Sequence, residues 1–157
     1  MRNNFLRFYF FGVLTVVVVG ALVAGGLYVA EMIEYPRQVP ITASTANLTA
    51  GARTYVADCS LCHGLAQRPL SNAARSVYPA PPQFFSHTDQ LATGLLYFRI
   101  HKGLFLTAMP GFGASLSDNQ IWQLALLLKN AGNLPPQAQS VLQSAPVSAV
   151  PTPGPQS

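Results

Sequence analysis

The sequence predicts an all-α protein with one membrane-spanning helix followed by a small helical domain. Three observations support this prediction. An uncharged apolar span runs from Phe8 to Ala30. Three later segments carry apolar residues at helical spacing, and the rest of the chain shows no convincing strand pattern. A length of 157 residues leaves room for one ordinary domain with an extra segment at each end.

The N-terminal apolar span is long enough to cross a bilayer, because about 20 apolar residues suffice for a helix. Arg2 and Arg7 precede it, and Glu31 and Glu34 follow it. The positive-inside rule therefore places the first residues in the cytoplasm and the rest of the chain outside.

A cleaved signal peptide is the alternative for this span. Its apolar region would usually be only about 7–15 residues long and would end in small residues. Cleavage after Ala24 would leave Leu22 two positions before the cut, and cleavage after Ala30 would leave Tyr28 there. We favour an uncleaved anchor, and both interpretations export the rest of the chain.

Composition limits the classes of partner. Half of the residues are hydrophobic and 9% are charged, against about a quarter charged in typical soluble proteins. The net charge of +4 comes from scattered residues. Without a basic cluster or stripe, the sequence predicts no nucleic-acid partner.

We expect four segments along the chain. Residues 1–31 form the cytoplasmic N-terminus and the transmembrane anchor, and residues 32–46 form a tether. Residues 47–134 form the domain. Residues 135–157 are rich in proline and carry no charge, so this tail should be flexible or bound to a partner.

The first helix of the domain should begin near Asn47 or Thr49 and run into the cysteine pair. One apolar face is predicted, consisting of Leu48, Ala52, Tyr55, Val56 and Cys59. A proline-rich stretch follows, and its prolines exclude regular helix or central strand.

Two more helices are predicted further along the chain. The second begins near Thr88 as N-cap and ends at Gly103. The third begins with a capping box of Ser117 and Gln120 and ends at Gly132. Its apolar stripe consists of Ile121, Leu124, Ala125 and Leu128. A domain of three helices has a small core, so we expect another group to fill its interior.

The only two cysteines lie in the motif Cys59-Ser-Leu-Cys62-His63. In a helical turn these three side chains project from one face. Two thiols at this spacing can form thioethers with the vinyl groups of a haem while His63 binds the iron, and this motif is the signature of covalent c-type haem attachment. Export agrees with this interpretation, because bacteria attach such haem outside the cytoplasmic membrane.

Three other interpretations of the motif are weaker. A structural disulfide leaves the adjacent His63 unexplained. A thioredoxin-like redox pair needs a βαβ context, which the chain lacks. A zinc site needs two further ligands, and His87 and His101 are too far apart for a zinc finger.

Met109 is the candidate for the sixth iron ligand. It is the only methionine in the domain, and the proline and glycine that follow it keep it off a helix. Methionine is the usual partner of histidine in electron-transfer haems, where it raises the potential. The alternative is that Met109 fills a gap in the core, and His87 and His101 are rival ligands.

Four stretches carry a family resemblance: "AGARTYVADCSLCHG", the proline-rich loop, "AMPGFG" and "LSDNQIWQLALLLKN". From about Asn47 to Pro135 they resemble a monohaem class I cytochrome c, and more narrowly the membrane-anchored bacterial kind. The resemblance implies three main helices around one covalent haem c, with the first and last packed together. Ala108 departs from the narrower group, which often has glycine there.

The resemblance also assigns roles to residues. It implies that Cys59 and Cys62 attach the haem, that His63 is the proximal iron ligand and Met109 the distal one, and that a carbonyl in "YPAPP" orients His63. The helix-crossing positions are Tyr55, Ile121, Trp122 and Leu124. The expected haem wall consists of Phe84, Phe85, Leu91, Leu95, Phe98, Leu104 and Phe112, with Arg75 or Arg99 as possible propionate partners.

The expected function is one-electron transfer at the periplasmic face of a bacterial inner membrane. The chain would be a carrier or the haem subunit of a larger membrane dehydrogenase, a quinol-oxidising complex or a terminal oxidase, and not itself an enzyme. The acids of the domain are Asp58, Asp89 and Asp118; the last two suit helix N-termini, so a hydrolytic site is not supported. The alternative is a haem sensor or haem enzyme with an open sixth coordination site.

The membrane anchor gives the first prediction. The intact protein should stay in the membrane fraction after high-salt and carbonate washing, because apolar burial and not surface charge holds it there. A fragment beginning near Ile41 should be soluble and still bind haem. N-terminal sequencing that starts at Gly25 or Glu31 would show instead that the span is removed.

Overall fold

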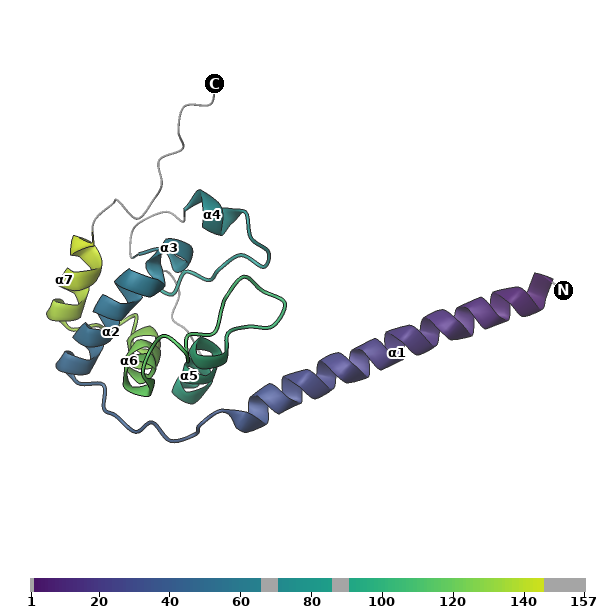
Figure 1. Ribbon diagram of the computed structural model, residues 1–157, viewed down its shortest axis with the longest axis horizontal. Helices are drawn as coiled ribbons and strands as arrows, with labels where there is room; N and C mark the ends of the chain where they lie inside the picture. The colour runs from purple at the N-terminus through teal and green to yellow at the C-terminus, as the bar shows by residue number, and fades with distance from the viewer. Residues whose placement is uncertain (1, 66–70, 86–90, 146–157) are drawn as a thin grey trace, which may run out of the picture. The chain divides into compact units, whose positions relative to one another are not determined.

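The computed structural model describes residues 2–65, 71–85 and 91–145. The chain divides into two compact units, Met1–Tyr35 and Pro36–Ser157. All regular elements among the described residues are helices (Figure 1). The all-α prediction is therefore confirmed.

The first unit is the single helix α1 (Arg2–Glu34). Its segment Tyr9–Val29 is long and apolar enough to cross a membrane, and its side chains are exposed along the whole segment. The helix continues past the predicted end of the apolar span and includes Glu31 and Glu34.

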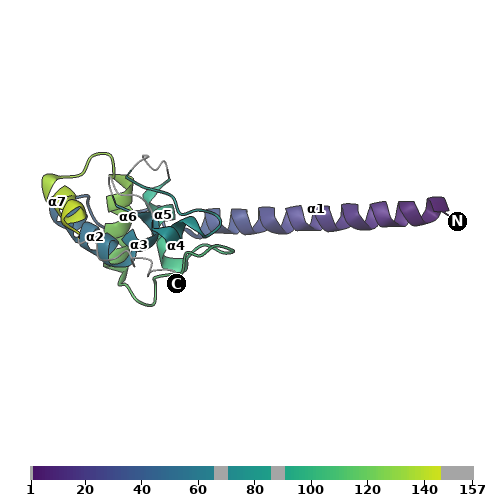
Figure 2. The same cartoon turned by 90° about the horizontal axis from the view of Figure 1, so that it is seen from above.

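Among its described residues, the second unit contains six helices: α2 (Thr45–Asp58), α3 (Ser60–His63), α4 (Asn72–Arg75), α5 (Thr93–Lys102), α6 (Asp118–Lys129) and α7 (Pro136–Ser144). Helix α6 packs against α2 and α5, and α7 packs against α2. The short helices α3 and α4 pack together beyond the C-terminal end of α2 (Figures 1 and 2).

Helix α2 begins earlier than the apolar pattern predicted. Ser44 is its N-cap, and the Ser44 hydroxyl accepts a hydrogen bond of 3.2 Å from the Asn47 backbone N–H. Serine is among the favoured N-cap residues because its oxygen satisfies a free amide of the first turn. Apolar periodicity could not locate this cap, since the first turn of α2 is polar or small.

The crossing of α2 and α6 requires glycine at position 51. A Cβ added to Gly51 would lie 2.8 Å from the carbonyl carbon of Gln123 and 3.3 Å from the Leu124 nitrogen. Next to this contact, the Gln123 side-chain amide donates a hydrogen bond of 3.2 Å to the Asn47 side chain. The predicted packing between the first and third helices of the domain is confirmed.

Helix α6 begins as predicted and ends earlier than predicted. The capping box is complete: Ser117 and Gln120 each bind the other's backbone N–H through their side chains. The predicted stripe is buried, together with Trp122, Leu126 and Leu127. The predicted end at Gly132 is wrong, because Asn130 caps the helix and its side chain donates a 2.8 Å hydrogen bond to the Leu126 carbonyl.

Helix α5 begins at Thr93, later than the predicted start near Thr88. Thr88 itself lies outside the described residues. The predicted C-terminal glycine is confirmed, since Gly103 has a φ of 78° and its N–H donates to the Arg99 carbonyl at 2.8 Å.

The expectation of a flexible or partner-bound tail after residue 134 is wrong for residues 136–144. These residues form α7 and pack against α2, and Ala138 and Leu142 are buried. Proline composition misled here because proline is well tolerated in the first turn of a helix, where Pro136 lies. Two apolar residues four positions apart then suffice to give α7 an inward face. Residues 146–157 lie outside the described part of the chain.

The helix crossing gives the second prediction. Replacing Gly51 by alanine should lower the free energy of unfolding by about 1–3 kcal/mol, because the added methyl group forces α2 and α6 apart. Thermal unfolding of the haem-loaded full chain in detergent measures the change. Gly132→Ala, at an exposed glycine outside the helices, is the control and should change stability by less than about 0.5 kcal/mol. Equal stability of the two variants would contradict the close crossing.

Candidate functional site

The cysteine motif lies in a tight helical turn that directly follows α2. Cys59 ends α2, and the backbone N–H groups of Cys62 and His63 donate to its carbonyl at 3.2 and 2.9 Å. Gly64, with a φ of 73°, ends the turn by donating from its N–H to the Ser60 carbonyl. The two thiols and the imidazole are therefore brought together as predicted, although a break at Cys59 separates α2 from α3.

Both cysteines carry free thiols. Cys59 is half-buried against the apolar core, and Cys62 is exposed. Burial, followed by the nearby Asp58 and Cys62, raises the pKa of Cys59 to about 12. The Cys59 thiol is therefore neutral in the protein alone, and the structure gives no support to the disulfide interpretation.

The His63 imidazole is oriented by a backbone carbonyl. Its Nδ1 lies 3.0 Å from the Pro82 carbonyl oxygen, which identifies the orienting residue that the sequence placed only within "YPAPP". The ring also lies against Phe84, with ring centroids 4.9 Å apart. With Nδ1 donating to Pro82, Nε2 is the nitrogen left to bind a metal.

Burial also sets the protonation of His63. It lowers the pKa of the imidazole, while the hydrogen bond to Pro82 acts in the opposite direction with a smaller effect. Metal binding requires the neutral imidazole, so burial keeps His63 in the form that can bind iron.

Two hydroxyl groups, those of Tyr55 and Ser71, donate hydrogen bonds to backbone carbonyls of the turn. The buried Tyr55 hydroxyl donates to the Gly64 carbonyl at 2.9 Å, and burial raises its pKa, so the hydroxyl keeps its proton. Ser71, a buried polar residue directly before α4, donates to the Leu61 carbonyl at 2.9 Å and accepts from the Ala74 N–H at 3.0 Å. Sequence reasoning missed Ser71, because one serine in a loop carries no signal of such a contact.

Met109 lies in the loop between α5 and α6, as predicted. Its carbonyl accepts a hydrogen bond of 3.2 Å from the Leu104 N–H, and its own N–H donates to the Thr107 hydroxyl at 3.2 Å. The side chain is half-buried and packs against the same apolar core as Cys59 and Phe84. The fold therefore brings the thioether, a thiol and the aromatic neighbour of His63 to one core.

The remaining residues that the sequence analysis singled out are the rival ligands, the arginines and the expected haem wall. His101 faces Asp118, with Nε2 4.0 Å from the carboxylate oxygen, and His87 lies outside the described residues. Arg75 is exposed and Arg99 is half-buried. Within the expected haem wall, Leu95 is buried; the half-buried members are Phe84, Phe85, Leu91, Phe98, Leu104 and Phe112.

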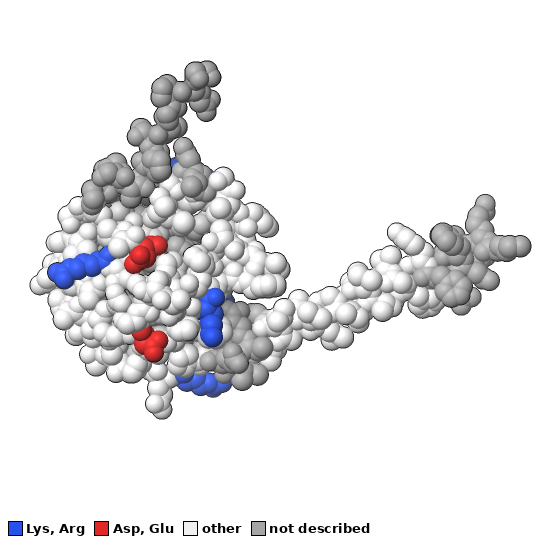
Figure 3. All heavy atoms as spheres, viewed as in Figure 1, with Lys and Arg blue, Asp and Glu red and all other residues white. Residues whose placement is uncertain are grey.

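Charged side chains are few on the face shown in Figure 3. In the described part of the chain, no three residues of the types His, Cys, Asp and Glu gather as a metal site would require. The zinc interpretation therefore gains no support. Two thiols and a neutral imidazole in one turn, together with a thioether against the apolar core, fit the donors that a c-type haem uses.

Comparison with known proteins decides the family. Residues 46–128, more than half of the chain, match the sequence family described as cytochrome c oxidase, cbb3-type, subunit III. The chain belongs to this family of cytochrome c domains. Membership implies covalently bound haem c and electron transfer, and the Cys59–Cys62 spacing agrees with it.

A solved structure supports the fold. The chain is similar to one from the reducing HAO-like protein complex of Kuenenia stuttgartiensis, with 24% sequence identity and a TM-score of 0.52. The similarity covers 61% of this cytochrome and 48% of that chain, so it spans about half of the other protein. Among curated proteins, none matches the chain.

The small core of this cytochrome gives the third prediction. Replacing Cys59 and Cys62 together by alanine should abolish covalent haem, measured by haem staining after denaturing electrophoresis. Circular dichroism should show loss of most helical structure in the domain, because a domain of this size has a small core that the bound haem would complete. Ser60→Ala in the same turn is the control and should retain haem. A cooperatively folded, haem-free double variant would contradict the prediction.

Proposed function

We propose that this cytochrome transfers single electrons through a haem held by Cys59 and Cys62, with His63 and Met109 as the axial iron ligands. When bound in this way, a c-type haem exchanges one electron between its ferrous and ferric states. The observation that carries the proposal is the 3.0 Å contact between His63 Nδ1 and the Pro82 carbonyl, which presents Nε2 as a ligand.

The contacts of His63 suit a permanent ligand. A carbonyl that accepts the Nδ1 proton fixes the tautomer and the ring orientation, and it makes the opposite nitrogen a better donor. The Phe84 ring lies against the imidazole and limits its rotation. On the other side, the hydrogen bond from Tyr55 to Gly64 fixes the end of the turn that carries His63.

Met109 suits the sixth position because its backbone is fixed while its side chain borders the core. Leu104 and Thr107 bind the backbone of Met109. The sulfur is a soft donor that favours ferrous over ferric iron, and an apolar wall acts in the same direction by excluding water. Together they predict a carrier of high potential.

The described acids do not form a catalytic group. Asp118 accepts a hydrogen bond from Tyr97, and Asp58 lies at the exposed end of α2. With both axial positions filled by protein, electron transfer requires neither substrate binding at the iron nor a general acid or base. We therefore propose an electron-transfer protein and not an enzyme in its own right.

We further propose that α1 anchors the cytochrome in the inner membrane with the haem domain in the periplasm. The supporting observations are the apolar span Tyr9–Val29 and the arginines that precede it. Between Glu34 and Thr45 the tether can extend about 3.3–3.6 Å per residue, so its fully extended length is at most roughly 40 Å. This length suits electron exchange with a membrane-bound respiratory complex, as a carrier or as a haem subunit of a dehydrogenase, a quinol-oxidising complex or a terminal oxidase.

The axial ligands give the fourth prediction. Met109→Ala should retain covalent haem and shift the ferric iron toward high spin, measured by visible spectroscopy. The reduction potential should fall by about 0.1–0.3 V, because axial ligands span roughly 0.8 V and the substitutes favour ferrous iron less than sulfur does.

His101→Ala is the matched control for ligand identity. Its imidazole lies toward Asp118, so the equilibrium spectrum and potential should stay close to those of the unmodified protein. An unchanged spectrum in Met109→Ala together with loss of the sixth ligand in His101→Ala would mean bis-histidine ligation and a low potential. High-spin iron in the unmodified protein, with ready uptake of carbon monoxide, would mean an open sixth position and favour a sensor or enzyme.

A further inference from the structure

The loop that carries Met109 is attached to the C-terminal end of α5. The Phe112 and Gly113 N–H groups donate to the carbonyls of Ile100 and His101 at 2.9 and 3.0 Å. Carbonyls in the last turn of a helix lack partners within the helix. The loop supplies these partners, so its backbone is tied to α5 three and four residues after Met109.

The His101 ring covers this attachment. A Cβ added to Gly113 would lie 2.6 Å from Cε1, 2.7 Å from Nε2 and 2.8 Å from Nδ1 of His101. Three ring atoms at nearly equal distance mean that the imidazole packs closely over the Gly113 backbone. Any side chain at position 113 would displace the ring, so glycine here serves the contact with His101.

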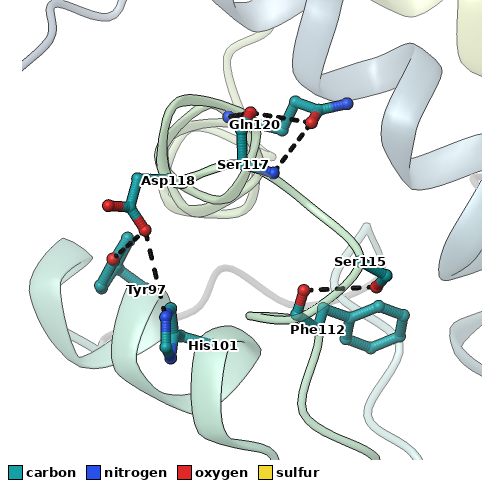
Figure 4. A network of polar contacts seen from close by, with 7 residues as sticks. All are labelled: Tyr97, His101, Phe112, Ser115, Ser117, Asp118 and Gln120. Carbon is teal, nitrogen blue, oxygen red and sulfur yellow. Dashed lines mark hydrogen bonds and ion pairs between the residues drawn. The ribbon is translucent and has the colours of Figure 1, made fainter.

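The ring also faces Asp118, the first residue of α6. Asp118 Oδ1 lies 4.0 Å from His101 Nε2 and accepts a 2.8 Å hydrogen bond from the Tyr97 hydroxyl (Figure 4). The Tyr97 ring stacks on Trp122 of α6, with ring centroids 4.2 Å apart. Burial, followed by the hydrogen bond to Asp118, raises the pKa of Tyr97 to about 12, so this hydroxyl remains a donor at neutral pH.

We propose that Tyr97, Asp118 and His101 form a clasp that positions Met109 by holding its loop, at Phe112 and Gly113, against the C-terminal end of α5. This inference rests on the proposed function, in which Met109 binds the iron. The clasp residues do not touch the iron; they act through the loop and set how often the sulfur leaves the metal and how fast an external ligand can replace it.

The contacts of the clasp should contribute unequally to holding the Met109 loop against α5. The His101 side chain is 31% exposed and that of Asp118 is 76% exposed, and exposed ion pairs add little stability. The packing of the ring on Gly113 should therefore contribute most, and the Tyr97 hydroxyl, whose hydrogen bond goes to Asp118, should contribute less. Asp118→Asn keeps an oxygen acceptor for Tyr97 and should weaken the clasp less than His101→Ala does.

The test measures the rate at which saturating imidazole replaces the sixth ligand in the ferric, haem-loaded full chain in detergent. At saturation, this rate equals the rate at which Met109 leaves the iron. His101→Ala should raise it by about tenfold, as expected when a local opening loses one packed side chain. His101→Gln, with a planar amide in place of the ring, should restore part of the loss, and Tyr97→Phe should raise the rate by a smaller factor.

Lys102→Ala is the matched control, because it removes an exposed side chain from the same end of α5 and should keep the unmodified rate. Amide hydrogen exchange at Phe112 and Gly113 gives a second readout, which should quicken in His101→Ala and, by a smaller factor, in Tyr97→Phe, but not in Lys102→Ala. If His101→Ala fails to fold, Tyr97→Phe decides the question.

Two outcomes separate the inference from the function on which it rests. If the unmodified ferric protein lacks the sulfur-to-iron charge-transfer band, the proposed ligation by Met109 is wrong. The clasp then has no iron ligand to position, and both proposals fail. If that band is present and the His101 and Tyr97 variants exchange ligand and amide protons at the unmodified rate, the ligation stands and the clasp is wrong.

Discussion

The close crossing of α2 and α6 at Gly51 is the constraint on which the rest of the domain depends. Helix α2 leads directly into the turn that carries the two thiols and His63. Helix α6 begins just after the loop that carries Met109, and it also packs against α5, to which that loop is attached. The crossing therefore fixes, through two short connections, the relation between the attachment turn and the methionine loop, and a single methyl group at Gly51 would disturb both.

Backbone carbonyls, and not charged side chains, orient the candidate site. His63 binds the Pro82 carbonyl, Tyr55 binds that of Gly64, and Ser71 binds that of Leu61. This arrangement agrees with a chain of which only 9% is charged. Neutral contacts leave the iron without a nearby fixed charge from these groups, and a rigid, apolar surrounding favours a high potential.

The sequence predicted features that local backbone geometry determines, and it did not predict contacts that depend on how distant segments pack. The capping box at Ser117 and the glycine after α5 were predictable because local backbone geometry requires those residues. Gly51 was not singled out, since a glycine inside a helix shows its purpose only when the partner backbone is placed. The contacts of the Pro82 carbonyl and of Ser71 depend on loops whose path no periodicity predicts. The contacts of Asp118 with Tyr97 and His101 depend on how α5 and α6 pack. Helix α7 was missed because proline content was weighed above the spacing of Ala138 and Leu142.

The central claim is that the Met109 sulfur binds the iron, and nuclear magnetic resonance of the reduced cytochrome tests it most directly. With methyl-labelled methionine, the full chain has three methyl signals, of which only Met109 belongs to the domain. The account predicts that one signal is displaced far upfield by the ring current of the haem, while those of Met1 and Met32 remain at ordinary positions. Three signals at ordinary positions in the reduced, haem-loaded protein would contradict it.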